Sequence, residues 1–349
     1  MRIIHTGDIH LGAMPDAGYA WSAQRGREIR QTFQRLIALV QEEKPELLLI
    51  AGDLFHRQPQ MSELKEVNYL FSKIPQTKVV LIAGNHDYID RKGFWEEIDW
   101  SENVIPLFGQ QCESVAVPEL DLRLYGCSYH SREIKENLYQ NVKPVGNEKY
   151  HLLLMHGGDA KHSPFDKNQR NLQSFDYLAA GHIHKPEILL PGKMAFCGAL
   201  EPLDRNDTGM HGYMDVQLLP TGNTVRFVPF AQRSYRDLPV QLTEDMSRGE
   251  VRDRIRDEMK ELGENDFYRI ILRGVRHPHT DMDTEELENL GNVTEVLDES
   301  HAAWDYEEIM RQYQGSLPAE FIRQVLQASE DESVRELALE YGMDALFGK

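Results

Sequence analysis

Cysteine, long apolar runs and repeated segments are scarce or missing in this chain of 349 residues. The three cysteines, Cys112, Cys127 and Cys197, are odd in number and widely spaced, so they predict neither a disulfide framework nor a CxxC zinc site. We interpret them as small buried residues of a protein in a reducing compartment. No apolar run approaches the roughly 20 residues that span a bilayer, and no signal-peptide pattern precedes the first apolar segment. The sequence therefore predicts a water-soluble, cytoplasmic protein with no membrane partner.

An excess of basic residues is also missing. The net charge of −19 disfavours a nucleic-acid binder, because phosphate contacts need Lys and Arg. The acidity is concentrated late in the chain: residues 236–349 hold 13 Lys and Arg against 28 Asp and Glu, whereas residues 1–235 hold 25 against 29. The basic cluster Arg25, Arg27 and Arg30 stands at a helix start, and we favour a solvated face over the alternative, a contact with a phosphate backbone. Composition therefore neither supports nor excludes a polyanionic substrate.

Short apolar segments alternate with helical patterns up to about residue 235. Apolar residues at helical spacing predict a helix over 28–43, which Pro45 ends, and a second helix over 61–74. The strand-helix-strand order predicts an α/β layered domain, in which later hairpin-like strands build a second sheet. The predicted strands are residues 3–6, 47–51, 79–83, 122–127, 152–155, 177–180, 195–198, 212–219 and 224–230.

The composition changes near residue 235, and the chain after this point has a different pattern. Residues 240–299 alternate strand and helix patterns and predict a compact α+β subdomain. Three helical stretches follow, which are too small to form a core alone. They either close the same chain as a helical layer or dock another protein. The predicted stretches are residues 306–313, 319–328 and 334–341, and the predicted domains are residues 1–235, 236–300 and 301–349.

Five motifs of ligand-type residues follow predicted strands in the first domain. Ligands bind beyond the carboxyl ends of strands in open α/β sheets, so one site can collect all five motifs. Each motif alone has a structural explanation, such as a turn or a hydrogen-bonded histidine pair. Together they offer carboxylates, imidazoles and one amide oxygen but no thiolate, a set that favours two manganese, iron or zinc ions over calcium. The motifs are Asp8-Ile9-His10, Gly52-Asp53, Gly84-Asn85-His86-Asp87, His156-Gly157 and Gly181-His182-Ile183-His184.

The array DxH, GD, GNHD, H and GHIH is similar to that of the calcineurin-like metallophosphoesterases over roughly the first 200 residues. Residues 5–12 (HTGDIHLG), 52–56 (GDLFH) and 198–203 (GALEPL) further resemble the SbcD and YhaO-type DNA repair exonucleases. The resemblance implies a four-layer αββα sandwich that forms the nuclease domain, a small α+β capping domain and C-terminal helices that dock an SbcC-like ATPase.

The resemblance also implies a role for each site residue. Asp87 would orient the imidazole of His86, and His56 would lie near the substrate, although it also suits a partly buried histidine beside a helix. His86 would not bind metal but would face the scissile phosphate and protonate the leaving oxygen. Asp8, His10 and His184 would bind one metal, Asp53 would bridge both, and Asn85, His156 and His182 would bind the second.

We therefore predict a metal-dependent DNA nuclease, a double-strand-end exonuclease with endonuclease activity in DNA repair. The resemblance implies manganese, 3′-to-5′ digestion, an SbcC-like ATPase as partner and a homodimer. The alternative is a phosphodiesterase or phosphatase that acts on a nucleotide or another small phosphoester, because the same metal centre serves both reactions. A non-catalytic binding module would lack a ligand or His86, and neither is missing.

Overall fold

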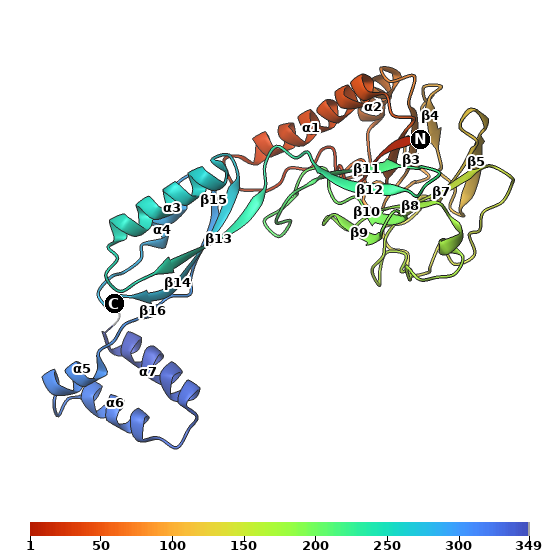
Figure 1. Ribbon diagram of the computed structural model, residues 1–349. Helices are drawn as coiled ribbons and strands as arrows, with labels where there is room; N and C mark the ends of the chain where they lie inside the picture. Colours follow the sequence, from red (N-terminus) through yellow and green to blue (C-terminus); the bar gives the residue numbers. More distant parts are fainter. Residues whose placement is uncertain (348–349) are drawn as a thin grey trace. The chain divides into compact units, whose positions relative to one another are not determined.

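A computed structural model describes residues 1–347, and these residues divide into two compact units (Figure 1). Unit 1 comprises Met1–Ser234, and unit 2 begins at Tyr235. The further division of unit 2 at residue 300 stays a prediction. No helix among residues 1–347 has the length and apolarity that a bilayer crossing demands.

The first sheet of unit 1 has the strand order β12-β11-β1-β2-β3-β4. Neighbours from β1 to β4 run parallel, and helices α1 and α2 pack Phe33, Leu36 and Leu64 onto one face of this sheet. Every residue of β2 is buried, as expected for a parallel strand with both faces covered. The elements are β1 (Arg2–Thr6), α1 (Ser22–Glu43), β2 (Leu47–Ala51), α2 (Met61–Ser72), β3 (Lys78–Ile82), β4 (Val104–Pro106), β11 (Gly212–Gln217) and β12 (Thr224–Pro229).

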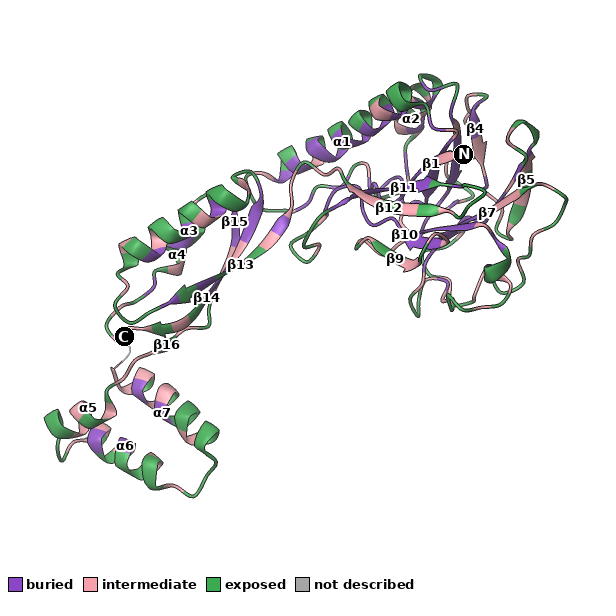
Figure 2. Ribbon diagram, viewed as in Figure 1, coloured by how far each residue is buried: buried purple, intermediate pink, exposed green. Residues whose placement is uncertain are grey.

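The second sheet has the strand order β5-β6-β7-β8-β10-β9 and packs on the other face of the first sheet. Leu49 and Val80 of the first sheet share this core with Leu152 and Leu154 of the second, and Figure 2 shows these strands as largely buried. The outer face of the second sheet is covered by loop segments and a short 3-10 turn, η2. The elements are β5 (Glu113–Val117), β6 (Leu122–Gly126), β7 (Tyr150–His156), η2 (Leu172–Ser174), β8 (Tyr177–Gly181), β9 (Glu187–Leu190) and β10 (Met194–Phe196).

These layers confirm the predicted α/β class and the second sheet, which contains the predicted later strands β6 and β10, but the last two predicted strands do not join it. The hairpin β11–β12 joins the first sheet, where β11 pairs antiparallel with β1. The second sheet instead contains β7 and β8, whose carboxyl ends carry the last two motifs. A hairpin with a buried strand such as β11 fits beside β1, because that edge of the first sheet would otherwise be unpaired.

The cysteines are not all free, contrary to the sequence prediction. Cys112 and Cys127 form a disulfide with a Cα–Cα distance of 4.2 Å, and Cys197 is buried and free. The pairing follows from the antiparallel register of β5 and β6, in which Glu113 lies opposite Gly126. Strand β5 is partly exposed and was not predicted, so no sequence pattern placed these two cysteines side by side.

The cluster of arginines at the start of α1 is not a uniformly solvated face, which corrects a second prediction. Arg27 and Arg30 are exposed or partly exposed, whereas the side chain of Arg25 is fully buried. Its guanidinium donates hydrogen bonds to Glu28 and Glu201. A buried charge of this kind needs paired carboxylates, and here they join α1 to the segment after β10.

Unit 2 begins with a parallel sheet in the order β13-β14-β15, and β16 pairs with the end of β14. Helices α3 and α4 lie on this sheet, where Val251, Ile255 and Leu287 contact the strand residues Leu238 and Ile270. The alternation of strand and helix is the one that the sequence predicts. The elements are β13 (Tyr235–Leu242), α3 (Arg248–Gly263), β14 (Phe267–Arg276), α4 (Thr284–Glu288), β15 (Val293–Asp298) and β16 (His301–Ala302).

The three terminal helices pack on one another, although the sequence predicted that they were too small for a core of their own. Ile309, Ile322, Leu339 and Met343 are buried together, one or two from each helix. Pro318 does not interrupt a helix but stands in the first turn of α6, where its missing N–H costs nothing. The helices are α5 (Tyr306–Gln312), α6 (Leu317–Gln327) and α7 (Glu332–Phe347).

Candidate metal centre

The five motifs meet where the carboxyl ends of both sheets of unit 1 face each other. His156 ends β7, and its ring Nδ1 donates a hydrogen bond of 2.8 Å to the carbonyl of Ala51 at the end of β2. The backbone N–H of His182, just after β8, donates to the carboxylate of Asp8 at 2.8 Å. The stacking of the two sheets therefore brings together residues that lie more than 100 positions apart.

The backbone at these strand ends turns through the left-handed region. Asp8, His10, Asp53 and His182 have φ values of 46°, 51°, 50° and 92°. This conformation costs a residue other than glycine about 1–2 kcal/mol. Asp and His tolerate it better than most residues do, and such strain is found where a site fixes the direction of its side chains. Each turn directs a ligand-type side chain into the space between the sheets.

Two glycines leave room for these side chains. A Cβ atom on Gly52 would lie 2.3 Å from Nδ1 of His156, and one on Gly84 would lie 2.2 Å from Oδ1 of Asp53. Both distances are far below van der Waals contact. The GD and GNHD motifs therefore need glycine for close approach, in addition to the turn that the sequence suggested.

The expected ligands form two overlapping groups. Donor atoms of Asp8, His10 and His184 lie within 4.8 Å of one another, and so do those of Asp8, Asp53 and His156. Oδ2 of Asp53 is 3.7 Å from Nε2 of His10 and 3.5 Å from Nε2 of His156, so its carboxylate stands between the groups. The resemblance implies that Asp53 bridges two metal ions, and this role stays a prediction.

Asn85 completes the second group with its amide oxygen. Oδ1 of Asn85 lies 2.9 Å from Nε2 of His156 and 3.0 Å from Nδ1 of His182. All seven expected ligands are therefore brought together by the fold. They are Asp8, His10, Asp53, Asn85, His156, His182 and His184.

Three of the four imidazoles are held through the nitrogen that faces away from the centre. Nδ1 of His184 bonds Asp207 at 2.9 Å, Nε2 of His182 bonds Asp159 at 2.8 Å, and Nδ1 of His156 bonds a carbonyl. These acceptors hold a ring proton on each outer nitrogen, so the inner nitrogen is the one that can give its lone pair to a metal ion. Nε2 of His10 is buried and, within residues 1–347, has no hydrogen-bond partner. The donor set therefore fits divalent metal ions.

The pKa values of the site reflect its concentration of buried charge. Burial lowers the pKa of His156, but Asp53 and Asp8 outweigh it and raise the pKa to about 9. Burial is likewise outweighed at His184, where Asp207 and Asp8 raise the pKa to about 9. Burial raises the pKa of Asp8 to about 6. In the metal-free protein, protons on two imidazoles thus supply the positive charge that the carboxylates require.

His56 and His86 lie together beside His10, outside the seven-donor group. Their rings stack with centroids 5.1 Å apart, and the His86 ring is 4.8 Å from that of His10. Nδ1 of His86 donates to the backbone carbonyl of His56 at 3.1 Å. Burial and His86 lower the pKa of His56, so its ring is neutral at neutral pH. The two side chains are partly or largely exposed and open toward solvent.

The predicted role of Asp87 is wrong. Its carboxylate accepts hydrogen bonds from the backbone N–H groups of Gly84 and Phe55, at 2.7 and 3.0 Å. It therefore joins the loops that follow β3 and β2 and does not contact the ring of His86, which is held by the carbonyl of His56 instead. The side chains of successive residues point in different directions at this turn, so adjacency in sequence did not give contact.

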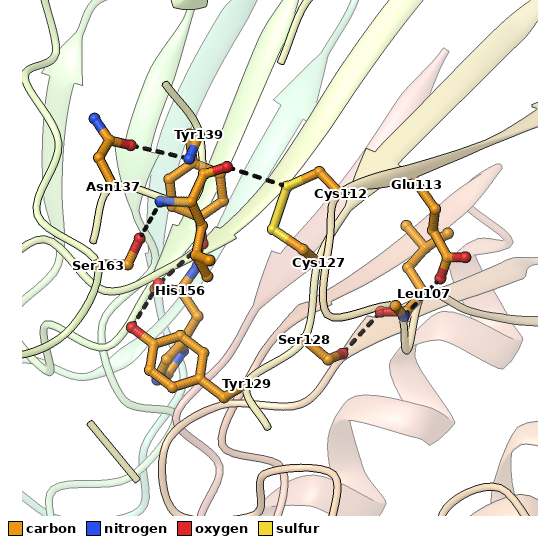
Figure 3. Close-up of a disulfide and its surroundings, with 12 residues drawn as sticks. Leu107, Cys112, Glu113, Cys127, Ser128, Tyr129, Asn137, Tyr139, His156 and Ser163 are labelled. Atoms are coloured by element: carbon orange, nitrogen blue, oxygen red, sulfur yellow. Dashed lines mark hydrogen bonds between the residues drawn. A yellow bond between two sulfur atoms is a disulfide. The ribbon is translucent and has the colours of Figure 1, made fainter. Parts of the chain in front are cut away.

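The sequence did not single out the residues that support the ligands. Asp159 and Asp207 each hold a histidine 23 positions away. The hydroxyls of Tyr129 and Tyr139 donate to the carbonyl of His156, and Tyr139 also accepts from its N–H, as Figure 3 shows beside the disulfide. The only sequence signal was the acidic residue three positions after His156 in the segment HGGD.

The comparison with known proteins assigns this site to a family. The sequence profile of the calcineurin-like phosphoesterases matches residues 1–186, more than half of the chain. The chain belongs to the calcineurin-like phosphoesterase family. This family uses a dinuclear metal site, and the His and Asp groups described above are able to form one.

Three relatives indicate a branch of the family that includes DNA repair nucleases. The DNA double-strand break repair protein Mre11 of Methanocaldococcus jannaschii is 28% identical over 59% of this chain, which spans 58% of that protein. The uncharacterized metallophosphoesterase YhaO of Bacillus subtilis is 25% identical over 78% of this chain and 72% of its own length. The SbcD component of the nuclease SbcCD of Staphylococcus epidermidis is 24% identical over 79% of this chain and 80% of its own length.

Proposed function

We propose that this protein is a metal-dependent DNA nuclease that works in DNA repair with an SbcC-like ATPase. It would digest double-stranded DNA from its ends and also cut internally. The observation that carries the proposal is the stacked pair of His56 and His86 at the solvent side of a complete seven-donor centre. The similarity to a DNA double-strand break repair protein and to a nuclease subunit supports the choice of DNA.

The proposed centre holds two divalent ions, with manganese as the expected metal. Such a pair activates water and neutralises the phosphate charge during in-line attack. The chain's own contribution is to orient three imidazoles. Asp159, Asp207 and the Ala51 carbonyl hold their outer nitrogens, so their inner nitrogens would face the metal ions. The proposed ligands are Asp8, His10 and His184 for one ion, Asp53 as the bridge, and Asn85, His156 and His182 for the other ion.

His86 is the proposed general acid. Its Nδ1 donates to the carbonyl of His56, so Nε2 is the ring nitrogen left to face a substrate, and Nε2 would carry the proton that passes to the leaving oxygen. A positioned acid of this kind stabilises or protonates the leaving oxygen. His56 stacks on the ring of His86 and limits its rotation.

The proposal is tested by offering the purified chain Mn²⁺ with four substrates in parallel. These are linear double-stranded DNA, closed circular DNA, a cyclic nucleotide and a bis-aryl phosphodiester. We expect loss of the linear DNA, slower nicking of the circle and dependence on Mn²⁺. Hydrolysis of only the small esters, also with an SbcC-like ATPase present, would contradict the nuclease proposal and support the alternative phosphodiesterase or phosphatase.

The terminal helices are the proposed docking element for the ATPase. Val334, Leu337 and Tyr341 are at helical spacing on α7 and are 51%, 50% and 68% exposed, although they are apolar or aromatic. We expect Leu337→Glu to abolish co-purification with the ATPase and to leave ester hydrolysis by the isolated chain unchanged. Glu336→Lys, on the neighbouring exposed position, serves as the control for charge alone.

The proposed location is the cytoplasm, which is the compartment of the chromosome in bacteria and archaea. Thiols are kept reduced there, and structural disulfides are rare. The Cys112–Cys127 disulfide is therefore the feature that most directly tests this location. A homodimer remains part of the proposal, and light scattering of the purified chain measures it.

A further inference from the structure

Asp159 connects the proposed metal centre to the loop that follows β7. Its Oδ2 accepts a hydrogen bond from Nε2 of His182 at 2.8 Å, while Nδ1 of the same ring lies 3.0 Å from the amide oxygen of Asn85. A carboxylate on Nε2 places the ring proton there, so Nδ1 carries the lone pair. Asp159 thus determines which nitrogen of His182 faces the centre.

The loop holds this carboxylate in place before any ligand arrives. Oδ1 of Asp159 accepts from the backbone N–H groups of Lys161 and His162, at 2.7 and 3.0 Å. The loop closes on itself through a bond of 2.7 Å from the N–H of Gly158 to the carbonyl of His162. A Cβ atom on Gly157 would lie 2.2 Å from that carbonyl, so the turn depends on glycine there.

His162 is a second imidazole on the same carboxylate. Its Nδ1 lies 2.9 Å from both oxygens of Asp159, and its ring centroid is 4.4 Å from that of His182. Two imidazoles and two backbone N–H groups therefore surround one carboxylate, which is the acceptor for His182.

The equivalent support on the other side of the centre is more enclosed. Asp207 accepts from Nδ1 of His184 at 2.9 Å and from the N–H of Leu203 at 3.0 Å, and its side chain is 16% exposed. The side chain of Asp159 is 46% exposed. Water competes more strongly for the exposed carboxylate. The hydrogen bond from His182 to Asp159 is therefore weaker than the one from His184 to Asp207.

We infer that Asp159 is a positioning residue for His182 and that it selectively sets the affinity of the metal position formed by Asn85, His156 and His182. This inference rests on the dinuclear centre of the proposed function, but not on the choice of DNA as substrate. Outer hydrogen-bond partners of metal-bound histidines typically change metal affinity about 10- to 100-fold. His162 assists because its Nδ1 also forms a hydrogen bond with Oδ2 of Asp159.

Metal binding to the full chain tests the inference without any substrate. Isothermal titration of the metal-free protein with Mn²⁺ gives the number of ions and each dissociation constant. For Asp159→Ala we expect one dissociation constant for Mn²⁺ to rise about 10- to 100-fold, while the other stays unchanged. Asp159→Glu should restore part of the loss, because it keeps the carboxylate. Thermal melting of each metal-free variant establishes that the fold is retained.

Two controls make the outcome specific. Asp166 is an exposed residue of the same segment, and its carboxylate accepts a hydrogen bond from the N–H of Asn168. The Asp166→Ala variant should bind both ions as the wild type does. Asp207→Ala should weaken the other position instead.

Unchanged constants in Asp159→Ala would overturn the inference. The inference would also be overturned if the wild type bound three ions and Asp159→Ala bound two. Donor atoms of Asp159, His162 and His182 lie within 4.8 Å of one another, and they would then form a separate metal site. A wild-type chain that binds two ions but cuts no DNA would contradict the proposed substrate and leave this inference standing.

Discussion

The two units of the chain differ in where their ionisable groups lie. In unit 1, carboxylates and imidazoles such as Asp8, His10 and Asp53 are buried at the strand ends. In unit 2, ion pairs such as Arg254 with Glu258 lie at or near the surface and contribute only about 0–1 kcal/mol each. Buried charges are costly unless they are paired or bind a metal, so unit 1 is the part built for chemistry.

The backbone shows the same difference. All eight non-glycine residues with positive φ among residues 1–347 lie in unit 1, and four of them are proposed ligands. Over residues 235–347, only glycines adopt this conformation. Unit 2 thus consists of relaxed local structure, and its distinctive features are net acidity and the apolar residues exposed on α7. Within residues 1–347, backbone strain at non-glycine residues is therefore confined to the unit proposed to be catalytic.

The largest effect is expected from removal of His86. His86→Ala should lower kcat for phosphodiester hydrolysis by about 100- to 10,000-fold, the usual contribution of a general acid. Both metal ions should remain bound, because His86 lies outside the seven-donor group. Steady-state kinetics with a bis-aryl diester and metal titration measure the two quantities. His277→Ala, at an exposed position of unit 2, should change neither. Loss of metal from the His86→Ala variant would show that His86 is a ligand and would contradict the proposed role.

A pair of glycine substitutions compares the two units directly. Gly84→Ala should lower the free energy of unfolding by about 1–3 kcal/mol and weaken metal binding, because its Cβ would collide with Asp53. Gly249→Ala, in the first turn of α3, has no atom closer than 3.9 Å and should stabilise the protein by up to about 1 kcal/mol. Denaturant unfolding measures both. Equal effects would show that the centre has more room than its contacts indicate.

The pH dependence of the metal-free protein should report the buried imidazoles of unit 1. The pKa values of His156 and His184 are about 9 in the folded protein, above the ordinary value of 6.5. Their contribution to stability is fully present below pH 6.5 and is lost as the pH rises through about 9. With EDTA, the melting temperature should therefore fall between about pH 6.5 and 9. Mn²⁺ should reduce this fall, since it replaces the protons. A flat profile in EDTA would contradict the buried cationic pair.

The smallest effect is expected from reduction of the Cys112–Cys127 disulfide, which should leave both units folded. The denatured protein should show one reactive thiol, from Cys197, before reduction and three afterwards. Thiol titration of protein purified without reductant makes the measurement. Three thiols at the outset would mean that Cys112 and Cys127 are reduced in the cell, which agrees with the proposed cytoplasmic location.

Local patterns were sufficient for the parts of the fold that depend on neighbours in sequence. The apolar runs of β1, β2, β3, β7 and β8 and the helical spacing of α1 and α2 were all predicted, most of them close to their observed bounds. The short or exposed strands β4, β5, β9 and β16 were missed, because partly exposed edge strands lack a strong apolar pattern.

The sequence by itself determined the types of the proposed ligands, their order and their position after buried strands, because side-chain chemistry and strand ends are local properties. Only the tertiary structure decided which residues support them. Asp159 and Asp207 reach histidines 23 positions away, and Asp87 turned out to join two loops. The disulfide likewise followed from strand register. Hydrogen bonds and pairings of this kind depend on how two sheets stack, and no local pattern contains that information.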